Sequence, residues 1–175
     1  MNGVPAHITY PDHDDISYGE NELMGKMWNR YVFETGDIQD SFLGPMTKSA
    51  VRCMDAAEGY LKDLGYVEDE TNLDGEVLIS AKFDWAVTGA SKRGWTVWLM
   101  AAVDPRIYAT FPVVCSMMNV QKYLHHHHDS YQGWSFAMDF LMDFDLTPEI
   151  DSKNFTSLVE LIDMYKMVLI IFHFI

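Results

Sequence analysis

The sequence predicts an α/β fold in which helices flank a parallel sheet. The prediction depends first on residues 83–115, where an apolar run, a glycine-rich turn, an amphipathic helix and a second apolar run follow one another. This order is the repeating unit of a parallel sheet. It depends second on the composition, which is 49% hydrophobic and 14% aromatic and therefore sufficient to bury a core. The length of 175 residues predicts one domain of ordinary size.

The first part of the chain is predicted to form an arm followed by two helices. Residues 1–19 contain prolines, glycines and an acidic cluster, so we expect a loop or an extended arm. Apolar residues at helical spacing predict one helix over 21–34 and, after a loop, a longer one over 47–64. Gly36 and Gly65 follow these two helices, as expected for residues that end a helix in a left-handed conformation.

The middle of the chain is predicted to alternate between strand and helix. Residues 67–76 are acidic and rich in turn-forming residues, so we expect a solvated loop. The segment resembles a calcium-binding loop, but two of the ligand positions lack the required residue. A strand is predicted over 83–88, a helix over 94–103 and a second strand over 109–115. Pro112 confines that second strand to an edge or a bulge of the sheet.

The last part of the chain is less regular in its pattern. Four consecutive histidines lie within 119–135, which we expect to be irregular. Helical patterns follow over 135–143 and 154–165. The strongly apolar residues after them are expected to form a buried strand over 168–172. The chain ends on the apolar residues Phe174 and Ile175 with no polar finish, so we expect a truncated C-terminus.

Charge and cysteine content exclude several classes of protein. The chain carries 12 Lys and Arg residues against 26 Asp and Glu residues, a formal net charge of −14. We therefore expect no nucleic-acid partner, because phosphate binding needs clustered cations, and no attachment to an anionic membrane surface. The apolar C-terminal run is too short to span a bilayer. Cys53 and Cys115 form no disulfide framework and no metal motif; we expect two buried free thiols, with one bridge as the alternative.

The motif that indicates chemistry is Gly-Ala-Ser-Lys-Arg-Gly at residues 89–94, between a predicted strand and a predicted helix. A serine at such a sharp strand-to-helix turn is a nucleophile elbow, whose neighbours must be small. Ser91 is therefore the candidate nucleophile, and the backbone N–H of Lys92 at the helix start is the candidate oxyanion donor. The second glycine comes one position later than in the usual motif. The alternative is a glycine-rich turn in which Ser91 caps the helix.

Other polar residues are weaker candidates, and the sequence indicates no cofactor and no metal site. The histidine run at 125–128 is interpreted as a loop rather than as a metal site or a catalytic base. His13, among aspartates, is interpreted in the same way. Asp139 and Asp143 lie one helical turn apart, which is more typical of an exposed helix face than of catalytic carboxylates. We expect four tryptophans to belong to the core: Trp85, Trp95, Trp98 and Trp134.

The chain resembles the PhoPQ-activated pathogenicity-related family, which includes the autocrine proliferation repressor A-like proteins. The resemblance covers roughly residues 20–165. It is carried by Pro-Met-Thr-Lys-Ser-Ala-Val-Arg at 45–52 and by Val-Thr-Gly-Ala-Ser-Lys-Arg-Gly-Trp-Thr at 87–96. Ala-Ala-Val-Asp-Pro-Arg at 101–106, Asn119 and Tyr-Gln-Gly-Trp-Ser at 131–135 continue it.

The resemblance implies an α/β-hydrolase-like fold, a secreted protein and a site centred on a serine. Two functions follow as expectations: a serine hydrolase acting on an ester or acyl substrate, or a non-catalytic secreted signalling protein that binds a cell-surface receptor. In the resembled fold the acid and the histidine of the triad follow the serine along the chain. We therefore expect residues 20–175 to be a partial domain in which Ser91 lacks its base, so that this chain is inactive. The chain also shows no signal peptide at Met1.

Overall fold

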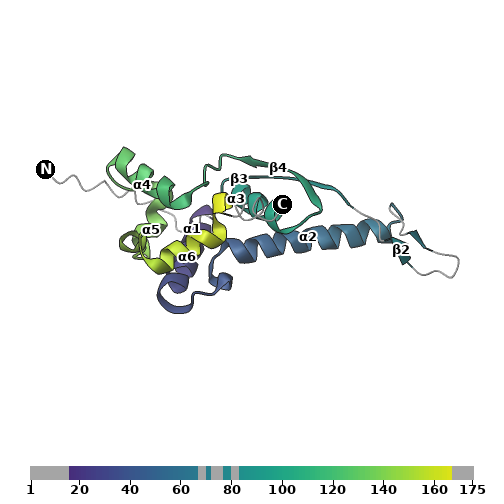
Figure 1. Ribbon diagram of the computed structural model, residues 1–175, viewed down its shortest axis with the longest axis horizontal. Helices are drawn as coiled ribbons and strands as arrows, with labels where there is room; N and C mark the ends of the chain where they lie inside the picture. Colours follow the sequence, from purple (N-terminus) through teal and green to yellow (C-terminus); the bar gives the residue numbers. More distant parts are fainter. Residues whose placement is uncertain (1–15, 67–69, 72–76, 80–82, 167–175) are drawn as a thin grey trace. The chain divides into compact units, whose positions relative to one another are not determined.

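The structure is a computed structural model that describes residues 16–66, 70–71, 77–79 and 83–166 (Figure 1). Its α-helices are α1 (Ile16–Arg30), α2 (Leu43–Asp63), α3 (Lys92–Val103), α4 (Val120–Tyr131), α5 (Asp139–Asp143) and α6 (Lys153–Ile162). Its strands are β1 (Glu70–Thr71), β2 (Val77–Ile79), β3 (Trp85–Ala90) and β4 (Ile107–Val113). Short 3-10 helices cover Ile38–Asp40, Phe136–Met138 and Thr147–Glu149. A π-helix, η1 (Tyr31–Thr35), continues α1.

The chain divides into two compact units. The first combines residues 1–45 with residues 117–175, and the second is the continuous segment 46–116. The second unit contains the predicted strand–helix–strand sequence. Each unit has buried residues of its own, described in turn below.

The second unit is built on a parallel pair of strands. β3 and β4 pair in parallel, with Ala90 opposite Val113 at their carboxyl ends, and α3 connects them. The helix lies against the strand pair, as Figure 1 shows. β1 and β2 form a separate antiparallel pair. The predicted unit over 83–115 is therefore confirmed, and the mixed architecture is that of an α/β protein.

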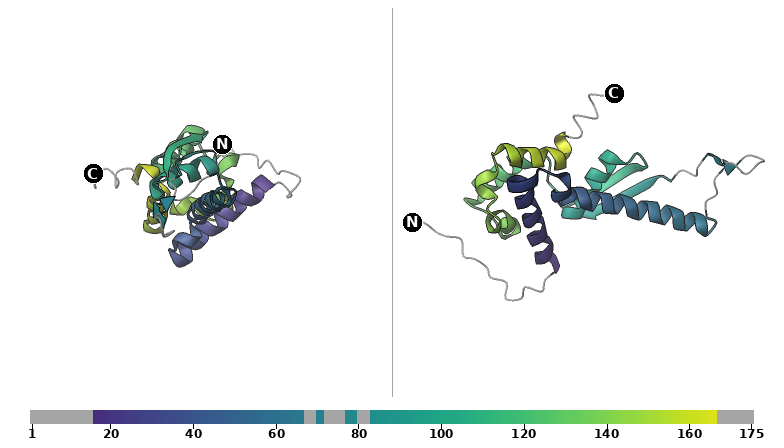
Figure 2. Two further views of the ribbon diagram at one scale, coloured as in Figure 1. Left: turned by 90° about the vertical axis from the view of Figure 1, so that its right-hand side faces the viewer. Right: turned by 90° about the horizontal axis from the view of Figure 1, so that it is seen from below.

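The core of the second unit lies where α2 meets α3 and the strands. Its buried members are Met54 of α2 and Val97 and Met100 of α3, with Trp85 and Ile107 packed against them. The right-hand view of Figure 2 shows α2 running beside this part of the molecule. The opposite face of the strand pair is exposed among the described residues. It carries Ala86, Thr88, Ala90, Tyr108, Phe111 and Val113.

The first unit has an aromatic core centred on Trp28, which is 1% exposed. Its indole meets the rings of Phe140 and Phe155 edge to face, with ring centroids 5.5 and 6.1 Å apart. The indole Nε1–H donates a hydrogen bond of 2.9 Å to the carbonyl of Ser41. Burial of this large side chain together with a satisfied donor holds α1, α5 and α6 in one unit.

Several sequence-based expectations are wrong in detail. The expected irregular segment at 119–135 contains helix α4, and α1 begins at Ile16, inside the expected arm. No disulfide joins the two cysteines, and Cys53 is exposed while Cys115 is half-buried, so the expected burial is wrong. The strand predicted over 168–172 lies outside the described residues.

The start of α4 depends on a residue far along the chain. Asp163, which is 1% exposed, accepts hydrogen bonds of 3.0 and 2.9 Å from the backbone N–H groups of Asn119 and Val120. A third hydrogen bond to this carboxylate, from the N–H of Tyr165, is 2.9 Å long. A carboxylate at this position satisfies donors that a helix N-terminus leaves without partners.

Candidate functional site

Ser91 lies at the turn between β3 and α3 in a conformation that L-residues rarely adopt. Its φ is 55° and its ψ is −124°. The N–H of Ser91 donates to the carbonyl of Val113 at 3.0 Å, and the Ser91 carbonyl accepts from the N–H of Trp95 at 3.0 Å. The residue is therefore fixed by β4 on one side and by the first turn of α3 on the other. Such conformations cost about 1–3 kcal/mol and concentrate at functional sites.

The glycines on either side of Ser91 allow this turn to form. A Cβ on Gly89 would lie 2.4 Å from the carbonyl oxygen of Arg93. A Cβ on Gly94 would lie 3.0 Å from the carbonyl oxygen of Gly89 and 2.9 Å from the Cβ of Cys115. The helix start thus packs directly on the strand end, and neither position has space for a side chain. The expectation that the neighbours of Ser91 must be small is met at these two positions.

The alternative role for Ser91, as a helix cap, is not the one that the structure shows. Ser91 precedes the first residue of α3, but its side chain makes no capping hydrogen bond. The residue is exposed. Ser91 thus differs from Ser152 before α6, whose Oγ accepts a hydrogen bond from the N–H of Phe155.

A second strained residue lies next to this turn. Val114, which directly follows β4, has a φ of 46° and is 80% exposed. A β-branched residue with positive φ is a genuine conformational outlier. Because β3 and β4 run in parallel, Ser91 and Val114 both lie at the carboxyl edge of the strand pair. Ligands of open α/β sheets bind at that edge.

The first turn of α3 is basic. Lys92 and Arg93 are its first two residues, and it contains no acidic residue. The Lys92 N–H belongs to the helix N-terminus, where backbone N–H groups and the helix dipole favour an anion. The two cationic side chains add to this positive potential in a chain with a net charge of −14.

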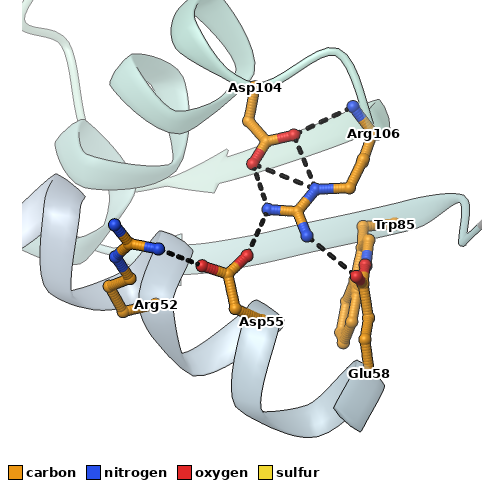
Figure 3. Close-up of polar contacts among 6 residues, drawn as sticks. All are labelled: Arg52, Asp55, Glu58, Trp85, Asp104 and Arg106. Atoms are coloured by element: carbon orange, nitrogen blue, oxygen red, sulfur yellow. Dashed lines mark hydrogen bonds and ion pairs between the residues drawn. The ribbon is translucent and has the colours of Figure 1, made fainter. Parts of the chain in front are cut away.

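The opposite, amino-terminal edge of the strand pair is held by a charge network that sequence analysis missed (Figure 3). Arg106, just before β4, donates to Asp104 through Nε at 2.9 Å and to Glu58 of α2 through Nη1 at 2.9 Å. It also pairs with Asp55 of α2 at 2.9 Å. The other oxygen of Glu58 accepts a 2.7 Å hydrogen bond from the Trp85 indole at the start of β3. Glu58 therefore joins both strands to α2.

Hydrogen bonding within this network shifts the pKa of its members. The Arg106 hydrogen bond lowers the pKa of Asp104, against the opposing effect of burial. Hydrogen bonds from Arg52 and then Arg106 lower the pKa of Asp55. The bonds to Asp104 in particular raise the pKa of Arg106. These shifts favour the charged forms of Asp104, Asp55 and Arg106, as expected for a structural network of ion pairs.

The four consecutive histidines lie in the first unit, on α4, and not in an irregular loop. His125 pairs with Asp151 at 2.8 Å on the surface, while His127 is only 9% exposed. Among the described residues, no group of three or more potential ligands could hold a metal ion. His13 lies outside the described residues. We assign none of the four helical histidines as the base for Ser91.

The remaining candidates have structural positions. Asp139 and Asp143 are the first and last residues of α5, and Asp143 is exposed. Of the expected core tryptophans, Trp95 is buried, whereas Trp85, Trp98 and Trp134 are half-buried. None of the described helices is long and apolar enough to cross a membrane.

Together, the fold and the turn define a mixed α/β protein with a serine at a strained strand-to-helix turn. The model of one protein family, described as PhoPQ-activated pathogenicity-related protein, matches residues 1–171. The chain belongs to this family. The family resemblance inferred from the motifs at 45–52 and 87–96 is thereby confirmed.

A curated relative supports the same assignment. The chain is 32% identical over 161 residues to the autocrine proliferation repressor protein A of Dictyostelium discoideum. The match covers 92% of the chain but only 29% of that relative. No solved structure matches the chain.

Proposed function

We propose that Ser91 is the nucleophile of a serine hydrolase of the ester- or acyl-cleaving type, within an α/β-hydrolase-like fold. The single observation that carries the proposal is the backbone of Ser91, with φ 55° and ψ −124° between β3 and α3. This strained strand-to-helix turn holds an exposed serine at the carboxyl edge of a parallel sheet, which is how a nucleophile elbow presents its hydroxyl. The absence of a capping bond from the Ser91 side chain supports the same assignment.

In the proposed reaction, Ser91 Oγ bonds to the carbonyl carbon of the substrate while its proton passes to a general base. The carbonyl oxygen becomes an oxyanion, and the Lys92 N–H at the start of α3 donates a hydrogen bond to it. The oxyanion then collapses and the ester C–O bond breaks as the base gives its proton to the leaving alcohol. Water, deprotonated by the same base, attacks the acyl carbon, and the acyl–Ser91 bond breaks to release the acid and return the proton to Oγ. A serine hydroxyl is a weak nucleophile without such a base. The identity of the base and its acidic partner is left open, since the chain spans 29% of its curated relative.

A second candidate function is a non-catalytic signalling role, in which the fold serves as a binding scaffold for a receptor. The relative's name, autocrine proliferation repressor, favours it. The two functions also share the expectation of secretion. They make different predictions for Ser91, because a scaffold does not need the hydroxyl.

The test is hydrolysis of a panel of p-nitrophenyl esters by the protein in its full natural length. We expect Ser91→Ala to lower the esterase rate by roughly 10⁶-fold. The matched control is Ser130→Ala, which removes another exposed serine hydroxyl, from the last turn of α4. Full esterase activity in Ser91→Ala would contradict the catalytic proposal. Unchanged repression of proliferation by Ser91→Ala, together with no esterase activity in either form, would favour the scaffold.

A further inference from the structure

His127 differs from the other three histidines of its run because it is buried. It is 9% exposed, whereas His125, His126 and His128 are exposed on α4. Its position follows from the helix: Val120, Leu124 and His127 are the buried residues of α4, at spacings of four and three. His127 thus occupies a place on the apolar face that a hydrophobic residue would normally fill.

The ring of His127 is held as a hydrogen-bond acceptor. Its Nε2 accepts a 3.2 Å bond from the backbone N–H of Ser135, eight residues further along the chain. A ring nitrogen that accepts a hydrogen bond carries no proton, so neutral His127 has its proton on Nδ1. Protonation of Nε2 would place two N–H donors opposite each other and remove the bond.

The same ring packs against the segment that it binds. The His127 ring stacks on the indole of Trp134, with centroids 5.9 Å apart and an interplanar angle of 15°. On the same helix, the ring centroids of Tyr131 and Tyr123 lie 4.8 and 6.1 Å from the centroid of the His127 ring. The hydrogen bond and the stack together fasten residues 134 and 135 to α4.

Among the described residues, the groups that face His127 include no anion that would pair with a protonated ring. They are His128 on the same helix and the phenols of Tyr123 and Tyr131, while Trp134 and Ser135 carry no titratable side chain. Among the described residues no carboxylate pairs with His127; Asp151 pairs with His125, and Asp129 lies 3.9 Å from His128.

Burial, and next the charge of His128, lower the pKa of His127. The ring is therefore neutral at pH 7 and gains its proton only at a pH below the ordinary value of about 6.5.

We propose that His127 is a pH-sensitive switch: protonation of Nε2 breaks the bond from the Ser135 N–H and releases Trp134 and Ser135 from α4. The released segment exposes an indole and a backbone donor that are held against the helix at neutral pH. The switch is independent of any activity of Ser91, because it belongs to the other compact unit.

The sign of the pH effect follows from the lowered pKa. A folded-state pKa below the ordinary value of about 6.5 means that the unfolded chain binds the proton more readily. The contact therefore contributes stability above about pH 6.5, and this contribution is lost as the pH falls through the folded-state pKa.

An NMR titration of the full chain from pH 8 to pH 4.5 tests the proposal. At pH 8 the ring nitrogens of His127 should show the Nδ1–H tautomer, with Nε2 unprotonated. On acidification, the Ser135 amide should lose its protection from hydrogen exchange, and the Trp134 indole signals should shift, with the midpoint of the His127 ring. That midpoint should lie below about 6.5.

Two variants separate the switch from general acid unfolding. His127→Gln keeps an acceptor that does not titrate, so the response of the Ser135 amide should disappear; His126→Gln, which changes an exposed neighbour, should leave it intact. The wild-type titration decides the question even if His127→Gln does not fold. An Nε2–H tautomer at pH 8, or a Ser135 amide that does not follow the His127 ring, would overturn the proposal.

Discussion

Gly94 lies so close to Gly89 that a Cβ at position 94 would be 3.0 Å from the Gly89 carbonyl oxygen. The first turn of α3 therefore rests directly on the end of β3. This contact, rather than the serine itself, allows the chain to reverse within one residue. Ser91 lies at that residue and adopts a φ of 55° as a consequence.

The contact predicts that Gly94→Ala destabilises the protein. The new methyl group would meet two backbone oxygens and Cys115, and forcing a methyl into a packed site costs about 1–3 kcal/mol. Urea unfolding measures the change. The matched control is Gly59→Ala in α2, where a Cβ meets nothing within 4 Å; there we expect a gain of about 0.5–1 kcal/mol. Equal effects at the two positions would contradict the close packing at Gly94.

The strain at Ser91 predicts that Ser91→Gly is more stable than Ser91→Ala. Glycine adopts positive φ without steric cost, whereas alanine keeps the strain of about 1–3 kcal/mol. Part of the gain is offset by the flexibility of glycine in the unfolded chain, so we expect a net difference of about 1 kcal/mol. Thermal unfolding of the two variants measures it. A less stable glycine variant would show that the backbone at position 91 is not strained.

A third prediction concerns the network at the other edge of the strand pair. Arg106→Leu would leave Asp104, which is 6% exposed, without its cationic partner, and we expect a loss of about 3 kcal/mol. Arg106→Lys keeps the charge but not the forked geometry, so its loss of stability should be smaller than that of Arg106→Leu. Arg52→Ala is the control, because Arg52 is 74% exposed and its pair with Asp55 is at the surface. Chemical denaturation should rank the three variants in this order.

The lowered pKa of Asp104 predicts a dependence of stability on pH. Its folded-state pKa lies below the unfolded value of about 3.9, so the stabilisation is present above about pH 4. It is lost as the pH falls through the folded-state pKa. The difference in unfolding free energy between the wild type and Asp104→Asn should therefore shrink between pH 5 and pH 2.5. A difference that grows on acidification would mean that the pKa is raised instead.

The strand–turn–helix–strand unit could be predicted from sequence because its signals are local. The spacing of Gly89, Ser91 and Gly94 is set by one turn of chain, and the apolar periods of β3 and α3 change there. The candidate nucleophile was found for the same reason. The family motif depends on the same local residues.

The remaining features depend on contacts between distant residues, which no local pattern reveals. Glu58 and Arg106 are 48 positions apart, and Asp163 reaches the start of α4 across 43 positions. Helix α4 was missed because His127 occupies an apolar position of its buried face, so that the helical period of Val120 and Leu124 is hidden. The burial of His127 depends in part on the indole of Trp134, which stacks on its ring, and no local pattern reveals that contact.

The central claim, that Ser91 is a nucleophile, is tested most directly by mapping the site of fluorophosphonate labelling in the protein at its full natural length. After labelling at neutral pH, peptide mass spectrometry identifies the modified residue. We predict modification of Ser91, its loss in Ser91→Ala, and its retention in Ser130→Ala. An unlabelled Ser91 peptide, or undiminished labelling of Ser91→Ala, would contradict the claim.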